Sequence, residues 1–262
     1  MLNIPENMAE ILSRRQFSAD TIGLSGAQVL CSDDMVLKIE RNSVSADNEH
    51  RMLAWLQGRL PVPEIIAFER AEGYNYLLMS RIADRMLCSD DILSDGGRLV
   101  ELAAQSCGLL WSADISDCPV SASLDHKLRL AAERVAGGLC SVEDAEPETY
   151  GPGGFASPEQ LLRWLEDNRP EERPVLTHGD LCLPNIFTDG SRITGFIDLG
   201  RSGAADMHAD LALLLRSIRH NLNGIYGGKK YPPVEPRLIF ERLGISPDPE
   251  QLRYYLLLDE LF

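Results

Sequence analysis

The chain has 262 residues and a formal net charge of −15, with 44% hydrophobic and 25% charged residues. This length and composition exclude a disordered chain or a disulfide-stabilised miniprotein, and they indicate one large domain or two lobes. The acidic balance disfavours binding to nucleic acid or anionic lipid, and it favours a cationic ligand. The six scattered cysteines form no CxxC, and neither a secretory signal nor a membrane-spanning run is present, so we expect reduced thiols in the cytoplasm.

The N-terminal third is predicted to be rich in strands. Short apolar runs at residues 27–31 and 35–40 flank a Ser-Asp-Asp turn and predict a β-hairpin. Residues 65–69 and 74–79 predict a second hairpin. Between the two hairpins, residues 48–57 have apolar side chains at helical spacing. This region therefore predicts a small antiparallel sheet with one helix.

The rest of the chain is predicted to be mostly helical. Two short strands at residues 186–187 and 193–197 flank an Asp-Gly turn, and residues 142–154 form a loop rich in acid, Gly and Pro. The helices predicted from apolar spacing are residues 98–111, 124–135, 158–166, 207–220 and 249–258.

These elements predict an α+β fold with two lobes. The smaller, antiparallel-sheet lobe spans residues 1–80, and the larger, mainly helical lobe spans residues 84–262. Residues 81–83 would form the hinge between them.

The densest group of chemically active side chains lies in residues 177–185. Here Asp180 is followed by Asn185, and a second carboxylate, Asp198, follows across the predicted hairpin. ATP-dependent phosphoryl transfer needs such a set. One carboxylate positions the acceptor hydroxyl and takes its proton, while an amide oxygen and a second carboxylate hold Mg²⁺ on the phosphates. Both metal ligands are hard oxygens, which suit Mg²⁺ rather than zinc.

This set resembles the catalytic loop and the metal-binding Asp-Phe-Gly motif of protein kinases, here at residues 178–180 and 198–200. Lys38 lies in a predicted strand, where a kinase keeps the lysine that holds the phosphates, and Glu49 on the next helix could pair with it. The turn at residues 23–26 occupies the place of the phosphate-covering loop but lacks the full G-x-G-x-x-G. Each residue alone also fits an ordinary structural role. Their joint occurrence in this order predicts a protein-kinase-like fold.

Two further residues are predicted to support the catalytic loop. His178 is expected to hydrogen-bond to backbone near the loop rather than to act as a base. Asp210, on the following helix, is expected to anchor the loop through backbone N–H groups.

The chain as a whole resembles the aminoglycoside 3′-phosphotransferases of the kanamycin kinase type. Many small-molecule kinases share the kinase-like residues, whereas the Gly-Arg-Ser-Gly extension after Asp198 and the Leu-Asp-Glu-Leu-Phe ending are more specific to this family. The matching stretches span nearly the whole chain in the family's order; they are residues 55–63, 77–80, 114–119, 178–180, 195–203, 216–219 and 258–262.

The resemblance implies roles at the nucleotide end of the site. Asp180 would be the catalytic base or hydroxyl positioner, Asn185 and Asp198 would bind Mg²⁺, and Lys38, oriented by Glu49, would contact phosphates.

The resemblance also implies contacts with the rest of ATP. Ser25 would contact the β-phosphate, and Ser80 and Ile82 would offer backbone groups to adenine. A tyrosine that some family members carry two residues before the lysine is Val36 here, which would give the purine an aliphatic wall.

At the substrate end, the resemblance implies that Arg201, Asp259, Glu260 and the carboxylate of Phe262 face the aminoglycoside. The loop around residues 143–148 would supply further acids, and Glu146 and Glu148 are both candidates. Acids suit such a ligand because they form charge-assisted hydrogen bonds with its ammonium groups. Acids at the end of a helix also oppose the helix dipole, which favours a functional reason for them.

The implied activity is ATP- and Mg²⁺-dependent phosphorylation of the 3′-hydroxyl of kanamycin- and neomycin-type aminoglycosides, which would confer resistance. A monomer without nucleic-acid or membrane partners is expected. One alternative is a related kinase acting on choline, a macrolide or a metabolite hydroxyl. Only 6% of the residues are aromatic, which disfavours a choline site. Another is a pseudokinase that binds nucleotide without catalysis, which the intact Lys38, Asp180, Asn185 and Asp198 disfavour.

Overall fold

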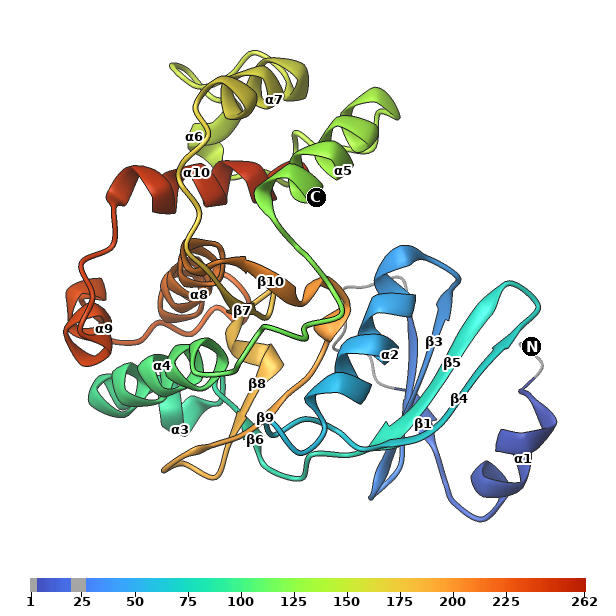
Figure 1. Cartoon of the computed structure of the whole chain (residues 1–262). Coiled ribbons are helices and arrows are strands. Elements are labelled where there is room, and N and C mark those ends of the chain that lie inside the picture. The colour runs from blue at the N-terminus through green and yellow to red at the C-terminus, as the bar shows by residue number, and fades with distance from the viewer. Residues whose placement is uncertain (1–3, 20–26) are drawn as a thin grey trace.

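The computed structural model describes residues 4–19 and 27–262, and it has a sheet-containing lobe beside a larger, mainly helical lobe (Figure 1). The sheet is antiparallel and has the strand order β1-β2-β3-β5-β4. Its strands are β1 (Ser18–Ala19), β2 (Gln28–Cys31), β3 (Met35–Arg41), β4 (Ile65–Ala71) and β5 (Tyr74–Ser80). The two predicted hairpins, β2–β3 and β4–β5, are confirmed.

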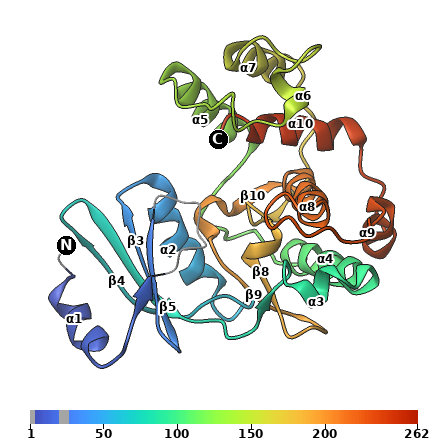
Figure 2. The ribbon, with the colours of Figure 1, turned by 180° about the vertical axis from the view of Figure 1, so that it is seen from behind.

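Two helices accompany this sheet (Figures 1 and 2). Helix α1 (Glu6–Ser13) packs Met8 against Leu37 and Ile39 of β3. Helix α2 (Val44–Leu56) buries its apolar residues in the core that extends into the helical lobe. The predicted helix began at residue 48, but α2 begins earlier because the Ser43 hydroxyl accepts a hydrogen bond of 3.1 Å from the Ala46 N–H and caps it.

Short strands organise the start of the helical lobe. After residues 81–84, which form no helix or strand, β6 (Arg85–Met86) joins β8 (Ile186–Thr188) and β9 (Ile193–Phe196) in a three-stranded sheet. Strands β7 (Pro174–Thr177) and β10 (Gly203–Asp206) pair with each other. This pairing brings together the two ends of the segment that carries the candidate catalytic residues.

The remaining helices form two packed groups. Helices α3 (Asp90–Leu93), α4 (Gly96–Trp111), α8 (Met207–Leu222) and α9 (Pro236–Leu243) surround the main core. Helices α5 (Leu124–Ala136), α6 (Pro147–Tyr150), α7 (Pro158–Asp167) and α10 (Pro249–Asp259) lie together at one end of this lobe, and both views place the C-terminus near α5 (Figures 1 and 2). Within the described ranges, no helix combines the length and apolar character that crossing a membrane requires.

Several short elements were not predicted from the sequence. Helix α6 lies within residues 142–154, which were expected to be a loop, and it has only 4 residues, too few to show helical periodicity. Helices α1, α3 and α9 were also missed. Strands β1 and β6 have 2 residues each, so no alternating pattern identifies them. These strands exist because a distant partner strand offers hydrogen bonds.

Candidate active site

Lys38, in the middle of β3, is the cation at the boundary between the two lobes. Side chains alternate along a strand, so Lys38 lies on the opposite face from Leu37 and Ile39, which pack on α1. Its Nζ lies 2.8 Å from Glu49 Oε2 on α2 and 2.9 Å from Asp198 Oδ1 of the helical lobe. The predicted pairing of Lys38 with Glu49 is confirmed.

Burial and the neighbouring charges together determine the protonation states of Lys38 and Glu49. The side chains of Lys38 and Glu49 are only 10% and 3% exposed. Burial alone lowers the pKa of Lys38, but the carboxylates of Glu49 and Asp198 outweigh it and raise this pKa above its usual value. Burial raises the pKa of Glu49 to about 6, an effect that Lys38 opposes. Lys38 is therefore an ammonium at neutral pH.

Helix α8 anchors the loop between β7 and η1 (Leu183–Asn185). The Asp210 carboxylate accepts hydrogen bonds from the backbone N–H groups of His178 (2.6 Å) and Gly179 (2.8 Å). His178 Nε2 lies 2.9 Å from the carbonyl oxygen of Ile197, next to Asp198. The predicted hydrogen bonds of Asp210 and of the His178 side chain to backbone groups are present. They join the loop carrying Asp180 to the loop carrying Asp198.

Asp180 is held by its own loop. Its Oδ1 accepts a hydrogen bond of 2.9 Å from Cys182 Sγ, and its Oδ2 accepts one of 3.2 Å from Asn185 Nδ2. The same Asn185 amide also donates to the Asp180 carbonyl oxygen (3.0 Å). The Asn185 amide nitrogen thus donates both of its hydrogen bonds to Asp180. The Asn185 Oδ1 atom accepts no hydrogen bond from the described residues.

Asp198 has a left-handed backbone, with φ 60° and ψ 56°, a conformation that a non-glycine residue rarely adopts. The turn that follows it, η2 (Leu199–Arg201), is fixed by Asn48 of α2, whose Nδ2 donates to the carbonyl oxygens of Gly200 and Ser202 at 2.9 Å each. The Asp198 side chain is 44% exposed. One of its oxygens meets Lys38, and the other, like Asn185 Oδ1, is a hard oxygen suited to Mg²⁺.

The crossover between the lobes carries the two residues expected to face adenine. The Ser80 N–H donates to the Glu64 carbonyl oxygen, and the Ser80 hydroxyl accepts from the Glu64 N–H, both at 2.9 Å. The backbone N–H of Ile82 has no acceptor among the described residues. The Ile82 side chain packs directly on Gly195 of β9, where a Cβ would overlap it. The predicted phosphate contact Ser25 lies outside the described residues.

The residues expected at the substrate end gather around a pocket of about 470 Å³ in the helical lobe. Glu146, Asp259, Glu260 and Phe262 all line it. Arg201 stands beside it, with Nη1 3.3 Å from Asp259 Oδ1 and its guanidinium 5.5 Å from the centre of the Phe262 ring. The other lining residues are Ser141, Asp144, Ala145, Pro147, Arg216, His220, Ile225 and Tyr226.

Three acids of this pocket, Glu146, Asp259 and Glu260, already face a cation of the protein. Arg216 forms an ion pair with Asp259, and its Nη1 lies 3.6 Å from Glu260 Oε1. Burial raises the pKa of Glu260 to about 7, although Arg216 opposes the shift. An ammonium ligand would therefore bind by exchanging partners with these side chains rather than by filling an unpaired acidic site.

Of the two candidate acids before α7, only one reaches the pocket. Glu146 precedes α6, and its carboxylate lies 2.9 Å from Arg219 Nη2 and 2.7 Å from His220 Nε2 on α8. Glu148, two residues further along in α6, is exposed and does not line the pocket. The structure therefore brings Glu146 but not Glu148 to the substrate end.

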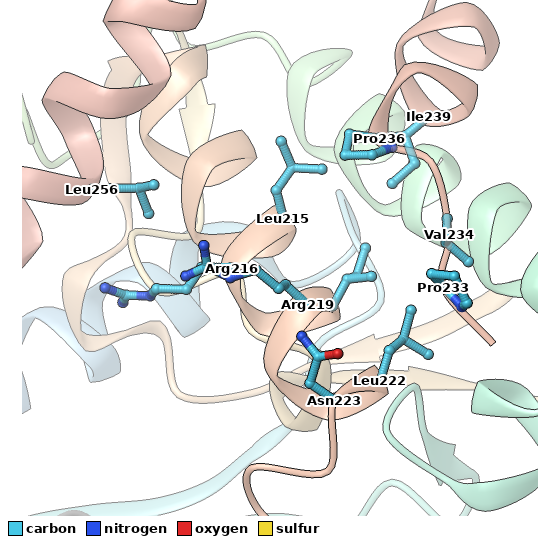
Figure 3. Close-up of a pocket in the computed structure, with 11 residues that line it drawn as sticks. Leu215, Arg216, Arg219, Leu222, Asn223, Pro233, Val234, Pro236, Ile239 and Leu256 are labelled. Atoms are coloured by element: carbon cyan, nitrogen blue, oxygen red, sulfur yellow. The ribbon is translucent and has the colours of Figure 1, made fainter. Parts of the chain in front are cut away.

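The cations of α8 were not predicted at this pocket, which Arg216 and His220 line and which Arg219 contacts through its ion pair with Glu146. Arg216, Arg219 and His220 are spaced so that they share one face of the helix, a signal that was present in the matching stretch 216–219. Arg216 and Arg219 also border a second pocket of about 350 Å³, whose other walls are mostly apolar (Figure 3). Its lining residues are Leu215, Arg216, Ile218, Arg219, Leu222, Asn223, Pro233, Val234, Pro236, Ile239 and Leu256.

A buried lysine–glutamate pair and an Asp-Asn-Asp set thus meet at the junction of an antiparallel-sheet lobe and a helical lobe. This combination of fold and site defines a phosphotransferase of the protein-kinase-like fold.

Comparison with known proteins identifies the family. A model described as the phosphotransferase enzyme family matches residues 16–255. An aminoglycoside 3′-phosphotransferase from Enterococcus faecalis is 38% identical over 272 residues, covering 100% of this chain and 99% of the relative. The chain therefore belongs to this family of phosphotransferases, and the predicted resemblance is confirmed.

Solved structures agree with this assignment. A crystal structure of an aminoglycoside-3′-phosphotransferase of type VIII has a TM-score of 0.78 and 28% identity, covering 97% of each chain. The aminoglycoside phosphotransferase APH(3″)-Id from Streptomyces rimosus, in complex with ADP and streptomycin, has a TM-score of 0.77 and 25% identity, covering 97% of this chain and 98% of that chain. The predicted protein-kinase-like fold is confirmed.

Proposed function

We propose that this protein transfers the γ-phosphoryl group of ATP to the 3′-hydroxyl of kanamycin- and neomycin-type aminoglycosides and so confers resistance to them. The main support for the proposal is that Asp180, whose carboxylate is oriented by two hydrogen bonds, lies in the same lobe as a pocket lined by several acids. The full-length similarity to an aminoglycoside 3′-phosphotransferase supports the choice of acceptor.

In this proposal Asp180 positions the acceptor hydroxyl and takes its proton as phosphoryl transfer proceeds. Its hydrogen bonds from Cys182 and Asn185 hold the carboxylate in one orientation, which favours catalysis by positioning. Lys38, kept charged by Glu49, would contact phosphate oxygens, and Ser80 and Ile82 would meet adenine at the crossover. Ser25 would reach the β-phosphate.

We propose Asn185 and Asp198 as the residues that hold Mg²⁺. Asn185 Oδ1 accepts no described hydrogen bond, and Asp198 uses only one oxygen for Lys38, so two hard oxygens are available, which fits this ion. When bound, Mg²⁺ would neutralise charge on the phosphates. The protein's own part is to fix the two ligand loops, through Asp210, His178 and Asn48.

The pocket chemistry supports a polycationic acceptor. In the proposal Asp259, Glu260 and Glu146 bind ammonium groups, together with the terminal carboxylate of Phe262, while Arg201 orients Asp259. Charge-assisted hydrogen bonds of this kind are stronger than neutral ones. Glu148 is left out of this set because it is exposed away from the pocket.

Two features of organisation complete the proposal. We propose residues 1–80 as the nucleotide-binding lobe, residues 81–83 as the hinge and residues 84–262 as the catalytic and aminoglycoside-binding lobe. A monomer in the cytoplasm is our prediction for the state in which the protein works.

An assay that couples ADP release to a colour change tests the function. Purified protein with ATP and Mg²⁺ is given kanamycin, its 3′-deoxy relative tobramycin, streptomycin, choline or a macrolide. We expect rapid ADP release with kanamycin and only background release with the other four. Equal rates with kanamycin and tobramycin would contradict transfer to the 3′-hydroxyl. Background release with every aminoglycoside would reject the proposed acceptor class, and turnover of choline would favour the alternative metabolite kinase.

A further inference from the structure

His220 is the one histidine among the residues that line the 470 Å³ pocket in the described part of the chain. Its Nε2 lies 2.7 Å from Glu146 Oε1, and its Nδ1 lies 3.2 Å from the Tyr226 hydroxyl. The tautomer with hydrogen on Nε2 satisfies both contacts, because it donates to Glu146 and accepts from Tyr226. Arg219 Nη2, which can only donate, also lies 3.4 Å from Nε2, so the neutral imidazole satisfies its contacts with Glu146 and Tyr226 but not this one. The side chain is 20% exposed, so protons reach it from solvent.

Protonation of His220 would add a positive charge to the pocket and reverse the hydrogen bond with Tyr226, because Nδ1 would then donate to the hydroxyl oxygen. Glu146 already forms an ion pair of 2.9 Å with Arg219. When His220 is neutral, the charges of Glu146 and Arg219 cancel. An imidazolium at His220 adds one positive charge, with no further carboxylate paired to it, to the lining of the pocket. The acids and the tyrosine around it are Asp144 and Glu146 before α6, Tyr226 after α8, and Asp259, Glu260 and the Phe262 carboxylate at the end of the chain. The cations are Arg216 and Arg219 on α8 and Arg134 on α5, which donates to the Phe262 oxygen.

We propose that His220 is a specificity-determining residue that links aminoglycoside binding to pH. Its neutral form admits a polycationic ligand to Glu146, and its protonated form competes with that ligand for the same carboxylate. This rests on the proposed function, in which the aminoglycoside occupies this pocket. Because linkage is reciprocal, aminoglycoside binding should expel a proton from His220.

The direction of the effect follows from these charges. Burial lowers the pKa of His220 below its usual value even though Glu146 opposes the shift, so the ring is neutral at physiological pH. Affinity for the ligand should fall as pH drops through this pKa. Glu260, with a pKa of about 7, also loses charge as pH falls and weakens binding in the same direction. A test must therefore separate the two groups.

The test compares the full chain with its His220→Gln variant, which keeps a hydrogen-bonding side chain but cannot titrate. The dissociation constant for kanamycin is measured by calorimetry in the presence of Mg²⁺ and a non-hydrolysable ATP analogue, from about pH 8 to about pH 5.5. His126→Gln is the matched control, since His126 lies on α5, contacts Arg129 and does not line the pocket.

We expect wild-type affinity to weaken over this range by roughly tenfold more than that of His220→Gln, and His126→Gln to follow the wild type. Titration of Glu260 and of the kanamycin amines is common to all three proteins, so the ratio of their constants isolates His220. Repeating the titrations in buffers of different ionisation enthalpy counts protons, and at low pH the wild type should release more protons on binding than His220→Gln does. A merely structural role of His220 would not change this count.

The outcomes separate the two proposals. If wild type and His220→Gln bind kanamycin with parallel pH profiles and equal proton release, the role of His220 is wrong while the proposed function stands. If kanamycin fails to bind the nucleotide-loaded wild type at any pH, the proposed acceptor site is wrong and the inference on His220 falls with it.

Discussion

The Asp180 carboxylate is held from two sides, by the Cys182 thiol at 2.9 Å and the Asn185 amide at 3.2 Å. These two hydrogen bonds restrict the orientation of the carboxylate. The ammonium of Lys38 instead forms ion pairs with Glu49 and Asp198. At the residue scale the site therefore separates the group proposed to take a proton from the groups proposed to hold nucleotide.

Replacing Asp180 with Ala tests this separation. We expect kcat to fall by roughly 10²- to 10⁴-fold, the usual contribution of a positioned base, while nucleotide affinity changes little because Lys38 and the Asp198 loop are untouched. Steady-state kinetics with kanamycin and calorimetric titration with an ATP analogue measure the two quantities. Asp33→Ala, in the exposed β2–β3 turn, is the control. Turnover of Asp180→Ala at the wild-type rate would disprove the assigned role.

Loops rather than helices carry the candidate catalytic groups, and the surrounding elements position those loops. Gly179 has φ 83°, and a Cβ there would overlap the carbonyl oxygen of Arg201. Only glycine allows the two loops to approach this closely at a positive φ. Helix α8 holds one loop through Asp210 and helix α2 holds the other through Asn48. At the element scale, the geometry of the site depends on this backbone contact.

A matched pair of glycine substitutions tests that contact. Gly73, in the β4–β5 turn, has φ 81°, close to that of Gly179, but nothing lies within 4 Å of its added Cβ. We expect Gly73→Ala to cost only the backbone conformational term of about 1 kcal/mol. Gly179→Ala adds a clash with backbone and should cost roughly 3 kcal/mol or more of unfolding free energy. Denaturant unfolding measures both, and equal losses would contradict the close approach.

The two lobes are linked by charges as well as by chain. Lys38 comes from the sheet, Glu49 from α2 and Asp198 from the helical lobe. The three are in contact, and Lys38 and Glu49 are buried while Asp198 is partly exposed. Removing the cation from such a group leaves an uncompensated buried carboxylate, which costs more than the pair itself contributes. At the scale of the whole molecule, we infer that Lys38 supports folding as well as nucleotide binding.

Lys38→Met should therefore lower the free energy of unfolding by about 3–5 kcal/mol. Glu49 would then have a pKa raised further above its unfolded value, so its charged form destabilises the fold at neutral pH. The variant should regain stability as pH falls through the raised pKa of Glu49 and the carboxyl takes up a proton. Lys38→Met combined with Glu49→Leu should recover most of the loss at neutral pH. Urea unfolding at several pH values checks this, and a pH-independent loss would disprove it.

The amino-acid sequence was enough to predict the two hairpins, most of the long helices and the nucleotide-end candidates, because each lies in a local pattern of spacing or turn chemistry. These candidates are Lys38, Glu49, Asp180, Asn185 and Asp198. It also indicated the acids of the C-terminal ending. Which residues of this set act as proposed stays a prediction.

The folded chain was needed to see which cations oppose those acids and which acid before α7 reaches the pocket. The contacts of Arg216 with Glu260, and of Arg219 and His220 with Glu146, join α8 to segments far away in the chain. Hydrophobic spacing predicts which face of a helix is buried, but it carries no information about which distant polar side chains meet on the other face. The charge balance of the pocket therefore depends on how the helices pack and cannot be predicted from the spacing of residues within one helix.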